Sequence, residues 1–182
     1  MVNLVTIDGQ RYLVDVGFGS DGPCLPIPLQ SGYECTGISP QMLKLEYKPL
    51  PMHTDPTQRV WVYVHKRNPE DPWLDAYAFS EIEFFPEDYE VMNLSTMTSP
   101  RSFFTQNVLC VKALLNMETN ELEGILSLYQ SEVKKKVNGE VQIVDKFTTE
   151  DQRVRGLEKW FGIRLTKNER SGIRYLASEL RN

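Results

Sequence analysis

The sequence predicts an α+β fold, in which a small antiparallel part that is barrel-like or sandwich-like precedes a part that mixes strands with helices. Two dipeptides that favour tight hairpin turns, Asp8-Gly9 and Asn138-Gly139, each lie between two strand-like runs. Residues 148–162 have the apolar spacing and the end signals of an amphipathic helix. These two hairpins and this helix are the clearest elements of the chain.

The composition is that of an ordinary globular protein. Apolar residues make up 41% of the 182 residues and charged residues 25%, so the chain can bury a core. A net charge of −5 provides no basic field that would favour nucleic acid or an anionic membrane surface. No apolar run approaches the roughly 18 residues of a membrane-spanning helix, and the N-terminal residues lack the pattern of a signal peptide. Since the three cysteines are odd in number and lack metal-ligand spacing, we interpret them as reduced thiols of a cytoplasmic protein.

Strand patterns dominate the first half of the chain. The run YLVDV, which ends at Val16, is apolar apart from Asp15 and leads into the glycine-rich turn GFGSDGP. Residues 59–66, RVWVYVHK, alternate as a strand requires, and a further extended run follows them. The stretch between these strands, residues 19–56, is rich in glycine and proline. This half therefore predicts a small antiparallel barrel or sandwich.

The pattern changes at Pro86. Residues 86–97 place acidic residues in a first turn and apolar residues after it, which indicates a helix. The segment that follows passes from a turn into a strand, and two more strands are expected near residues 122–128 and 131–137. Residues 170–182 are a candidate for a short terminal helix. We divide the chain into a β-barrel-like domain at residues 1–85, an interdomain helix and turn at 86–105, and an α/β domain at 106–182.

Few residues of the sequence belong to recognisable catalytic or ligand-binding motifs. The sequence has no phosphate-binding loop, dinucleotide fingerprint, zinc-protease motif or paired cysteine motif. The two histidines, His53 and His65, fit solvated or structural roles better than catalytic ones. The three cysteines are odd in number and lack metal-ligand spacing, so we interpret them as reduced thiols and expect no metal site.

Asp15 is the exception. A carboxylate in an apolar strand is costly to bury unless it is paired or accepts several hydrogen bonds. In one interpretation it ends the strand and caps the turn that follows. In the other it orients a histidine, which then activates a nucleophile. The residues alone leave both interpretations open.

Two stretches resemble the arylamine N-acetyltransferase family. Residues 5–29, VTIDGQRYLVDVGFGSDGPCLPIPL, are similar to the family segment that carries a triad aspartate. Residues 92–104, MNLSTMTSPRSFF, resemble the family's N-x-x-x-S-T-x-P-x-S-x-F stretch. The likeness continues through the second hairpin and the segment FTTEDQRVRGLEKWFGI, spans nearly all of the chain and is strongest to fungal members.

The resemblance implies ping-pong acyl transfer from acetyl-CoA or another acyl-CoA to the nitrogen of an arylamine or arylhydrazine. A cysteine thiolate carries the acyl group, a histidine activates the cysteine, and an aspartate orients the histidine. By this likeness Asp15 is the triad aspartate. Phe18 would line the acceptor pocket. Its neighbours Gly17 and Gly19 would let the backbone approach the ligand. The candidates for coenzyme A contacts are Ser95, Arg101 and Ser102.

The resemblance also implies that the family's cysteine and histidine lie ahead of Met1, in a helical domain whose R-G-G-x-C-x-E segment has no counterpart here. The chain would then be the C-terminal two-thirds of a cysteine-proteinase-like transferase fold, with a barrel-like domain followed by an α/β lid. Cys24 has no histidine nearby in the sequence and is not expected to replace the nucleophile. We expect the full-length form to be the enzyme, and this chain alone to be inactive and to self-associate through exposed apolar surface.

Two alternatives stay open. The chain can be a non-catalytic module that binds acyl-CoA or an arylamine, or that modulates a full-length paralogue. It can also be an unrelated β-rich domain in which VDVGFG is a coincidence, although the order of the later family-like segments argues against this. Acyl-CoA and arylamine small molecules are the expected partners of the enzyme and of the binding module. Neither nucleic acid nor a membrane is expected as a partner.

Overall fold

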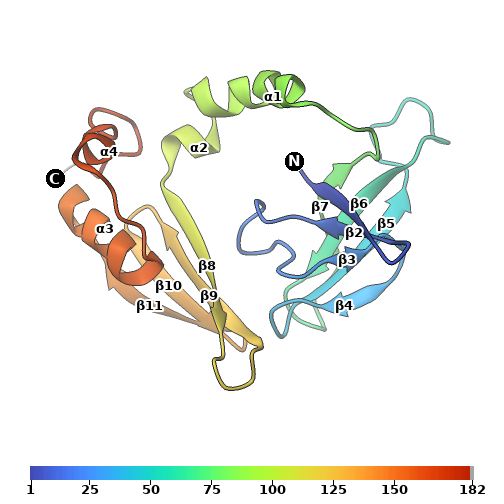
Figure 1. Ribbon diagram of the computed structural model, residues 1–182, viewed down its shortest axis with the longest axis horizontal. Coiled ribbons are helices and arrows are strands. Elements are labelled where there is room, and N and C mark those ends of the chain that lie inside the picture. Colours follow the sequence, from blue (N-terminus) through green and yellow to red (C-terminus); the bar gives the residue numbers. More distant parts are fainter. Residues whose placement is uncertain (181–182) are drawn as a thin grey trace. The chain divides into compact units, whose positions relative to one another are not determined.

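Figure 1 shows the computed structural model of the chain, which describes residues 1–180. The chain divides into two compact units. Unit 1 comprises Met1–Glu83 and Asn116–Glu123, and unit 2 comprises Phe84–Leu115 and Gly124–Asn182. The domain boundaries after residues 85 and 105 stay a prediction.

Unit 1 is built on two antiparallel sheets, with strand orders β1-β2-β3 and β4-β5-β6-β7. Its strands are β1 (Asn3–Ile7), β2 (Gln10–Val14), β3 (Ile27–Pro28), β4 (Glu34–Thr36), β5 (Met42–Lys48), β6 (Val60–Lys66) and β7 (Leu74–Phe79). Within residues 1–180 these strands form open sheets and no closed barrel. The antiparallel character is therefore confirmed, whereas the barrel-like detail is not.

The β1–β2 hairpin confirms the first turn signal. Asp8 and Gly9 have φ values of 50° and 79°, and two positive φ angles are what a type I′ turn requires. The predicted extent of the second strand is wrong, because β2 ends at Val14 and not at Val16. The residue opposite Val14 is the first of β1, so no paired residue of β1 holds the chain in the strand beyond that point. Asp15 therefore follows the strand rather than lying inside it.

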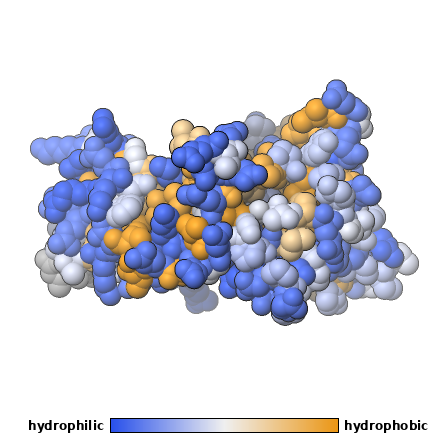
Figure 2. Space-filling view, turned by 90° about the horizontal axis from the view of Figure 1, so that it is seen from below, coloured by the Kyte–Doolittle hydropathy of each residue, from blue (hydrophilic) through white to orange (hydrophobic). Residues whose placement is uncertain are grey.

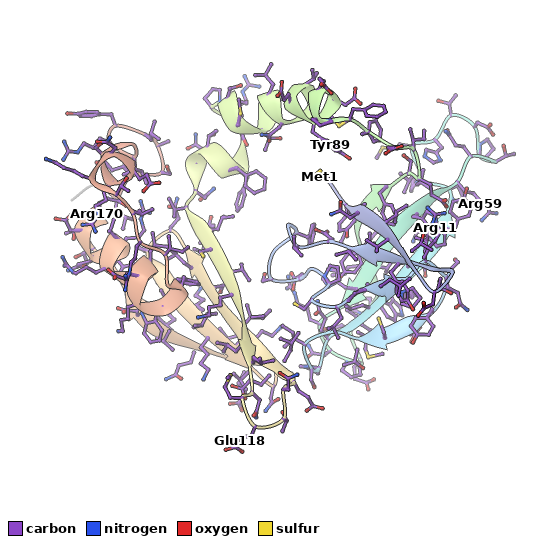
Figure 3. All side chains as sticks on the ribbon, viewed as in Figure 1. Met1, Arg11, Arg59, Tyr89, Glu118 and Arg170 are labelled. Carbon is purple, nitrogen blue, oxygen red and sulfur yellow. The ribbon has the colours of Figure 1, made fainter. Side chains whose placement is uncertain are left out.

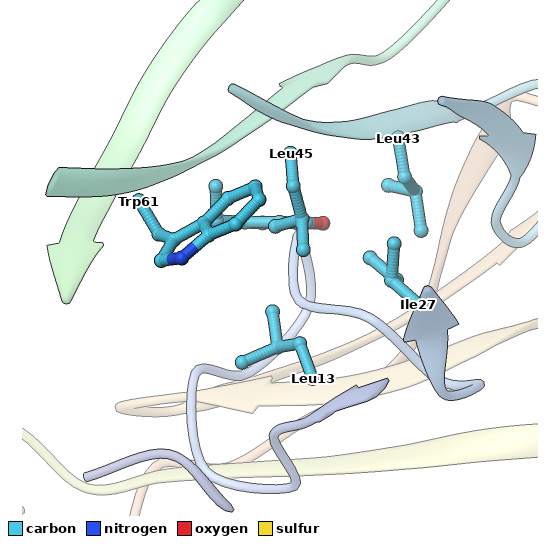
Figure 4. Packing of buried hydrophobic residues seen from close by; sticks show 6 residues of the cluster. Leu13, Ile27, Leu43, Leu45 and Trp61 are labelled. Carbon is cyan, nitrogen blue, oxygen red and sulfur yellow. The ribbon is translucent and has the colours of Figure 1, made fainter. Parts of the chain in front are cut away.

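The core of unit 1 combines side chains from both sheets. Figure 4 shows Leu13 and Ile27 of the first sheet packed with Leu43, Leu45 and Trp61 of the second. At the edge of this core the Trp61 Nε1 donates to a Glu81 carboxylate oxygen at 2.7 Å. Glu81 also forms an ion pair with Arg11, which Figure 3 labels. The segment that follows β7 is therefore bonded to side chains of both β2 and β6.

Unit 2 contains helices and most of a four-stranded antiparallel sheet of order β11-β10-β9-β8. Its elements are α1 (Pro86–Thr98), α2 (Phe103–Gln106), β8 (Leu109–Leu115), β9 (Leu122–Tyr129), β10 (Glu132–Val137), β11 (Glu140–Lys146), α3 (Glu150–Gly156), a π-helical turn η1 (Leu157–Phe161) and α4 (Lys167–Ser171). Asn138 and Gly139, with φ of 50° and 83°, form the second predicted hairpin. The short helix α2 was not predicted, because four residues are too few for a helical repeat.

The predicted helix of residues 148–162 is present as α3 followed by η1. Thr149 caps it by accepting the Gln152 N–H at 3.3 Å, and Gly162 ends it with φ 74°. The terminal helix expected in residues 170–182 is instead α4, which begins at Lys167 behind a Thr166 cap. Residues 181 and 182 of that prediction lie outside the described residues.

Apolar side chains also reach the surface, where Figure 2 shows them in orange. Helix α1 also exposes apolar side chains, since none of its residues is buried. The exposed large apolar residues of α1 and α2 are Val91, Met92, Leu94, Met97, Phe103 and Phe104. No helix in residues 1–180 is both long and apolar enough to span a membrane.

Candidate functional site

Asp15 begins the loop that connects β2 with β3, and it is only 8% exposed. Its Oδ1 accepts a hydrogen bond from the Gly17 N–H at 2.8 Å. This is the turn cap of the first interpretation, in which an aspartate bonds the main chain two residues later. A cap does not exclude the second interpretation, because the carboxylate keeps further lone pairs that can accept a hydrogen bond.

Tyr77, on β7, is the close neighbour of this carboxylate that sequence reasoning missed. Burial raises the pKa of Tyr77, and the adjacent Asp15 carboxylate raises it further. Within the described residues, the buried Tyr77 hydroxyl has no hydrogen-bond partner. Tyr77 lies opposite Tyr63 of β6 in the sheet register, and the alternation of LDAYAF was the one signal that could have placed it there.

Phe18 covers this pair of tyrosines. Its ring centroid lies 5.0 Å from that of Tyr77 and 6.2 Å from that of Tyr63, while the two tyrosine rings stack at 5.1 Å. Phe18 remains 44% exposed, so one side of its ring is held and the rest is open to solvent. Gly19 has φ +100°, which a residue with a side chain rarely adopts.

Asp21 ties the same loop to the second sheet. Its main-chain oxygen accepts hydrogen bonds from the Tyr63 hydroxyl at 2.8 Å and from Gln41 Nε2 at 3.1 Å. Its carboxylate pairs with Arg67 at 2.8 Å. Asp15, Gly17, Phe18 and Gly19 therefore belong to one loop whose far part is fastened to β6.

The cysteines and histidines of the chain do not complete a catalytic group around Asp15. All three cysteines are free thiols, as expected, and partial burial raises the pKa of Cys24, Cys35 and Cys110. His65 is buried and stacks on Tyr63 at 6.1 Å, and its Nδ1 has no partner within residues 1–180. His53 Nδ1 lies 3.0 Å from the Gln58 carbonyl oxygen. Neither imidazole is hydrogen-bonded to Asp15 in the described structure.

The predicted coenzyme A contacts lie in unit 2. The carbonyl of Ser95, on α1, accepts the Ser99 N–H at 3.0 Å, and the Arg101 N–H donates to Ser99 Oγ at 3.3 Å. The Ser102 hydroxyl caps α2 by accepting the Phe104 N–H at 3.3 Å. Ser102 thus has a structural task that the sequence prediction did not include. Within residues 1–180 no three His, Cys, Asp or Glu side chains are grouped as a metal site needs.

Comparison with known proteins gives one consistent result. A family model described as N-acetyltransferase matches residues 1–170. The chain is 37% identical over 181 residues to the N-malonyltransferase FDB2 of Fusarium pseudograminearum, and 36% identical over 183 residues to the N-malonyltransferase FDB2 of Gibberella moniliformis. These matches cover 95% of the chain but 53% and 52% of the relatives, so the chain spans about half the length of the curated relatives it matches.

Solved structures share the fold. The arylamine N-acetyltransferase of Salmonella typhimurium has a TM-score of 0.75 at 18% identity, covering 94% of this chain and 59% of that one. The Mycobacterium abscessus enzyme has a TM-score of 0.73 at 20% identity, covering 93% and 56%. The Mycobacterium marinum enzyme in complex with CoA has a TM-score of 0.69 at 22% identity, covering 89% and 53%.

Proposed function

Because the chain belongs to the arylamine N-acetyltransferase family, we propose that it forms the aspartate-bearing part of an acyltransferase. The reaction moves an acyl group from acyl-CoA to a cysteine and from there to the nitrogen of an arylamine or arylhydrazine. The observation that carries the proposal is the nearly buried Asp15 carboxylate, which lies beside Tyr77 at the start of a loop fastened to the sheet. A carboxylate in this position suits the task of holding a histidine in one tautomer.

In this proposal the other loop residues shape the acceptor site. The half-exposed Phe18 ring forms one wall for the aromatic amine, since aromatic rings pack well against one another at offset or tilted angles. Gly17 and Gly19 let the main chain approach the ligand without a side chain in the way. Coenzyme A would contact Ser95, Arg101 and Ser102, and the two parts of the chain would act as a barrel-like domain and a lid.

The acyl group need not be acetyl. The fungal relatives are named N-malonyltransferases, and a related enzyme has been solved with CoA, so malonyl-CoA and acetyl-CoA are both proposed donors. Conjugation of foreign arylamines in the cytoplasm is the physiological role that we propose for this chemistry.

The 182 residues alone are proposed to be inactive. The raised pKa values of the three thiols favour the protonated form, which is a poor nucleophile. Neither histidine hydrogen-bonds Asp15 in the described structure, so a histidine and a reactive cysteine would have to come from polypeptide beyond these residues. The exposed apolar side chains of α1 and α2 would favour self-association of the isolated chain.

The test compares this chain with a joined protein, in which the chain is fused to the part of the Fusarium pseudograminearum relative that it does not cover. Release of CoA from acetyl-CoA and malonyl-CoA would be measured with aniline and phenylhydrazine as acceptors. We expect transfer by the joined protein and none by the chain alone. A joined protein that folds but transfers no acyl group would contradict the proposal. Calorimetric binding of acyl-CoA to the chain alone, without transfer in either form, would favour the binding-module alternative.

A further inference from the structure

One main-chain atom, the carbonyl oxygen of Asp21, attaches the loop that starts at Asp15 to two buried side chains. That oxygen accepts hydrogen bonds from the Tyr63 hydroxyl at 2.8 Å and from Gln41 Nε2 at 3.1 Å. Both donors are buried, with 0% of Tyr63 and 5% of Gln41 exposed. The two donors come from different parts of the chain, 42 and 20 residues away from Asp21.

Neither polar group is needed for the sheet to form. A phenylalanine would fill the place of Tyr63 in the core, where it packs with Leu45 and Trp61. Burying a hydroxyl or an amide costs free energy unless each finds a partner. A carbonyl oxygen can accept two hydrogen bonds, and the Asp21 oxygen accepts one from each of these buried side chains. The hydrogen bonds from Tyr63 and Gln41 therefore stabilise the position of the loop rather than the sheet.

Arg67 provides a second, more exposed attachment, since its Nε and Nη2 donate to the two carboxylate oxygens of Asp21 at 3.3 and 2.8 Å. The Arg67 side chain is 58% exposed, and ion pairs in water are weak and screened by salt. The two hydrogen bonds to the Asp21 carbonyl come from buried side chains and are therefore less subject to this screening.

The fastened residue lies close to the groups that the proposed reaction uses. The Gly22 N–H donates to the Gly19 carbonyl at 3.1 Å, which closes a tight turn around Asp21. Phe18, directly before this turn, packs its ring on Tyr63 itself. Tyr63 therefore holds the loop at two places, through its ring and through its hydroxyl, while Asp15 is held at the beginning of the same loop.

We propose that Tyr63 and Gln41 are positioning residues: through the Asp21 carbonyl they fix the loop so that the Asp15 carboxylate and the Phe18 ring keep their places against the second sheet. The expected effect of these residues on acyl transfer rests on the proposed function. Their effect on the order of the loop does not.

The fixing of the loop is tested on the 182-residue chain. The reporter is the Gly17 amide, which bonds the Asp15 carboxylate, and its hydrogen exchange is followed by NMR. The variants are Tyr63→Phe, Gln41→Met and the double variant, each close in volume to the original side chain. Each single variant leaves one donor and should raise the exchange rate of Gly17 only about two- to fivefold. The double variant removes both of these donors, so its rate should exceed the product of the single effects, by about tenfold or more.

Trp61→Phe is the matched control. It also removes a hydrogen-bond donor from an aromatic residue of β6, but that donor bonds Glu81 and not the loop. It should lower the urea midpoint of unfolding while Gly17 exchanges at the rate of the unaltered chain. Gly17 exchange that is unchanged in the double variant overturns the proposal, and so does an equal increase in the control.

The catalytic meaning is tested in the joined protein. The double variant should lower kcat by about tenfold or more and leave the KM for acyl-CoA within about twofold, because positioning acts on the reacting groups. Faster Gly17 exchange with an unchanged kcat overturns the positioning role. A joined protein without activity contradicts the proposed function, and the exchange measurement then still decides whether Tyr63 and Gln41 fix the loop.

Discussion

The two stretches that resemble the N-acetyltransferase family differ in how the fold holds them. The loop from Asp15 to Asp21 contacts residues far away in the sequence, namely Tyr77 of β7, Tyr63 of β6 and Gln41, which directly precedes β5. Residues 92–104 make the hydrogen bonds of two short helices and the turn between them, and no residue of α1 is buried. Two comparable sequence patterns therefore correspond to very different degrees of structural constraint.

This difference in burial shows where a residue's role can be inferred from its contacts within the chain. In the loop, burial makes each polar contact costly to lose, so the contacts limit what Asp15 and Phe18 can do. In residues 92–104, side chains such as Leu94 and Met97 gain nothing from the core of their own unit. The packing of their own unit therefore does not explain their identity. Changes in the loop should accordingly have large, specific effects, whereas replacing exposed apolar side chains of the second stretch should change stability little.

The largest effect is expected for Asp15→Asn in the joined protein. An amide keeps the shape of the carboxylate and can still cap Gly17, but it does not orient and stabilise a protonated histidine. We expect kcat to fall by about 10³- to 10⁴-fold with little change in stability. Steady-state kinetics with acetyl-CoA and malonyl-CoA measure this. Asp21→Asn is the control in the same loop, and an equal loss there, or none in Asp15→Asn, would show that Asp15 only caps the turn.

A smaller effect is expected for Tyr77→Phe. Burial and the Asp15 carboxylate raise the pKa of Tyr77, so the hydroxyl stays neutral and able to donate throughout the working pH range. Its removal should lower kcat of the joined protein by about tenfold through loss of a donor beside Asp15. Because the hydroxyl makes no full hydrogen bond in the described residues, urea unfolding should change by less than about 1 kcal/mol. A large loss of stability with unchanged kcat would assign Tyr77 to the core alone.

The sequence predicted the parts of this fold that depend on near neighbours. Asp8-Gly9 and Asn138-Gly139 determine their hairpins because positive φ angles are a property of those residues. The end of β2 was predicted two residues too late, because a strand ends where its partner ends, and the partner is not visible in the run YLVDV. Tyr63 and Gln41 were missed as partners of the loop for the same reason, since their contacts with Asp21 span 42 and 20 residues.

The turn of the loop gives a prediction about stability. Gly19 has φ +100°, where a side chain is strained although nothing lies within 4 Å of an added Cβ. Gly19→Ala should therefore destabilise the chain by about 1–2 kcal/mol in urea unfolding. Gly172→Ala is the control, since Gly172 has φ −65° and an added Cβ would make only ordinary contacts. Equal stabilities of the two variants would mean that the loop relaxes without cost and is less fixed than its contacts indicate.

The smallest effect on stability is expected in α1. Leu94 and Met97 are 54% and 60% exposed, so replacing both by glutamine removes no buried apolar contact and should change the free energy of unfolding by less than about 0.5 kcal/mol. Leu45→Gln is the contrasting variant, because a fully buried leucine replaced by a polar side chain costs about 2–5 kcal/mol. Sedimentation velocity should show less self-association of the α1 variant, since apolar surface drives such contacts. A loss of stability in α1 as large as that of Leu45→Gln would mean that another copy already covers this helix, and that the contrast between the two stretches holds only for the separate chain.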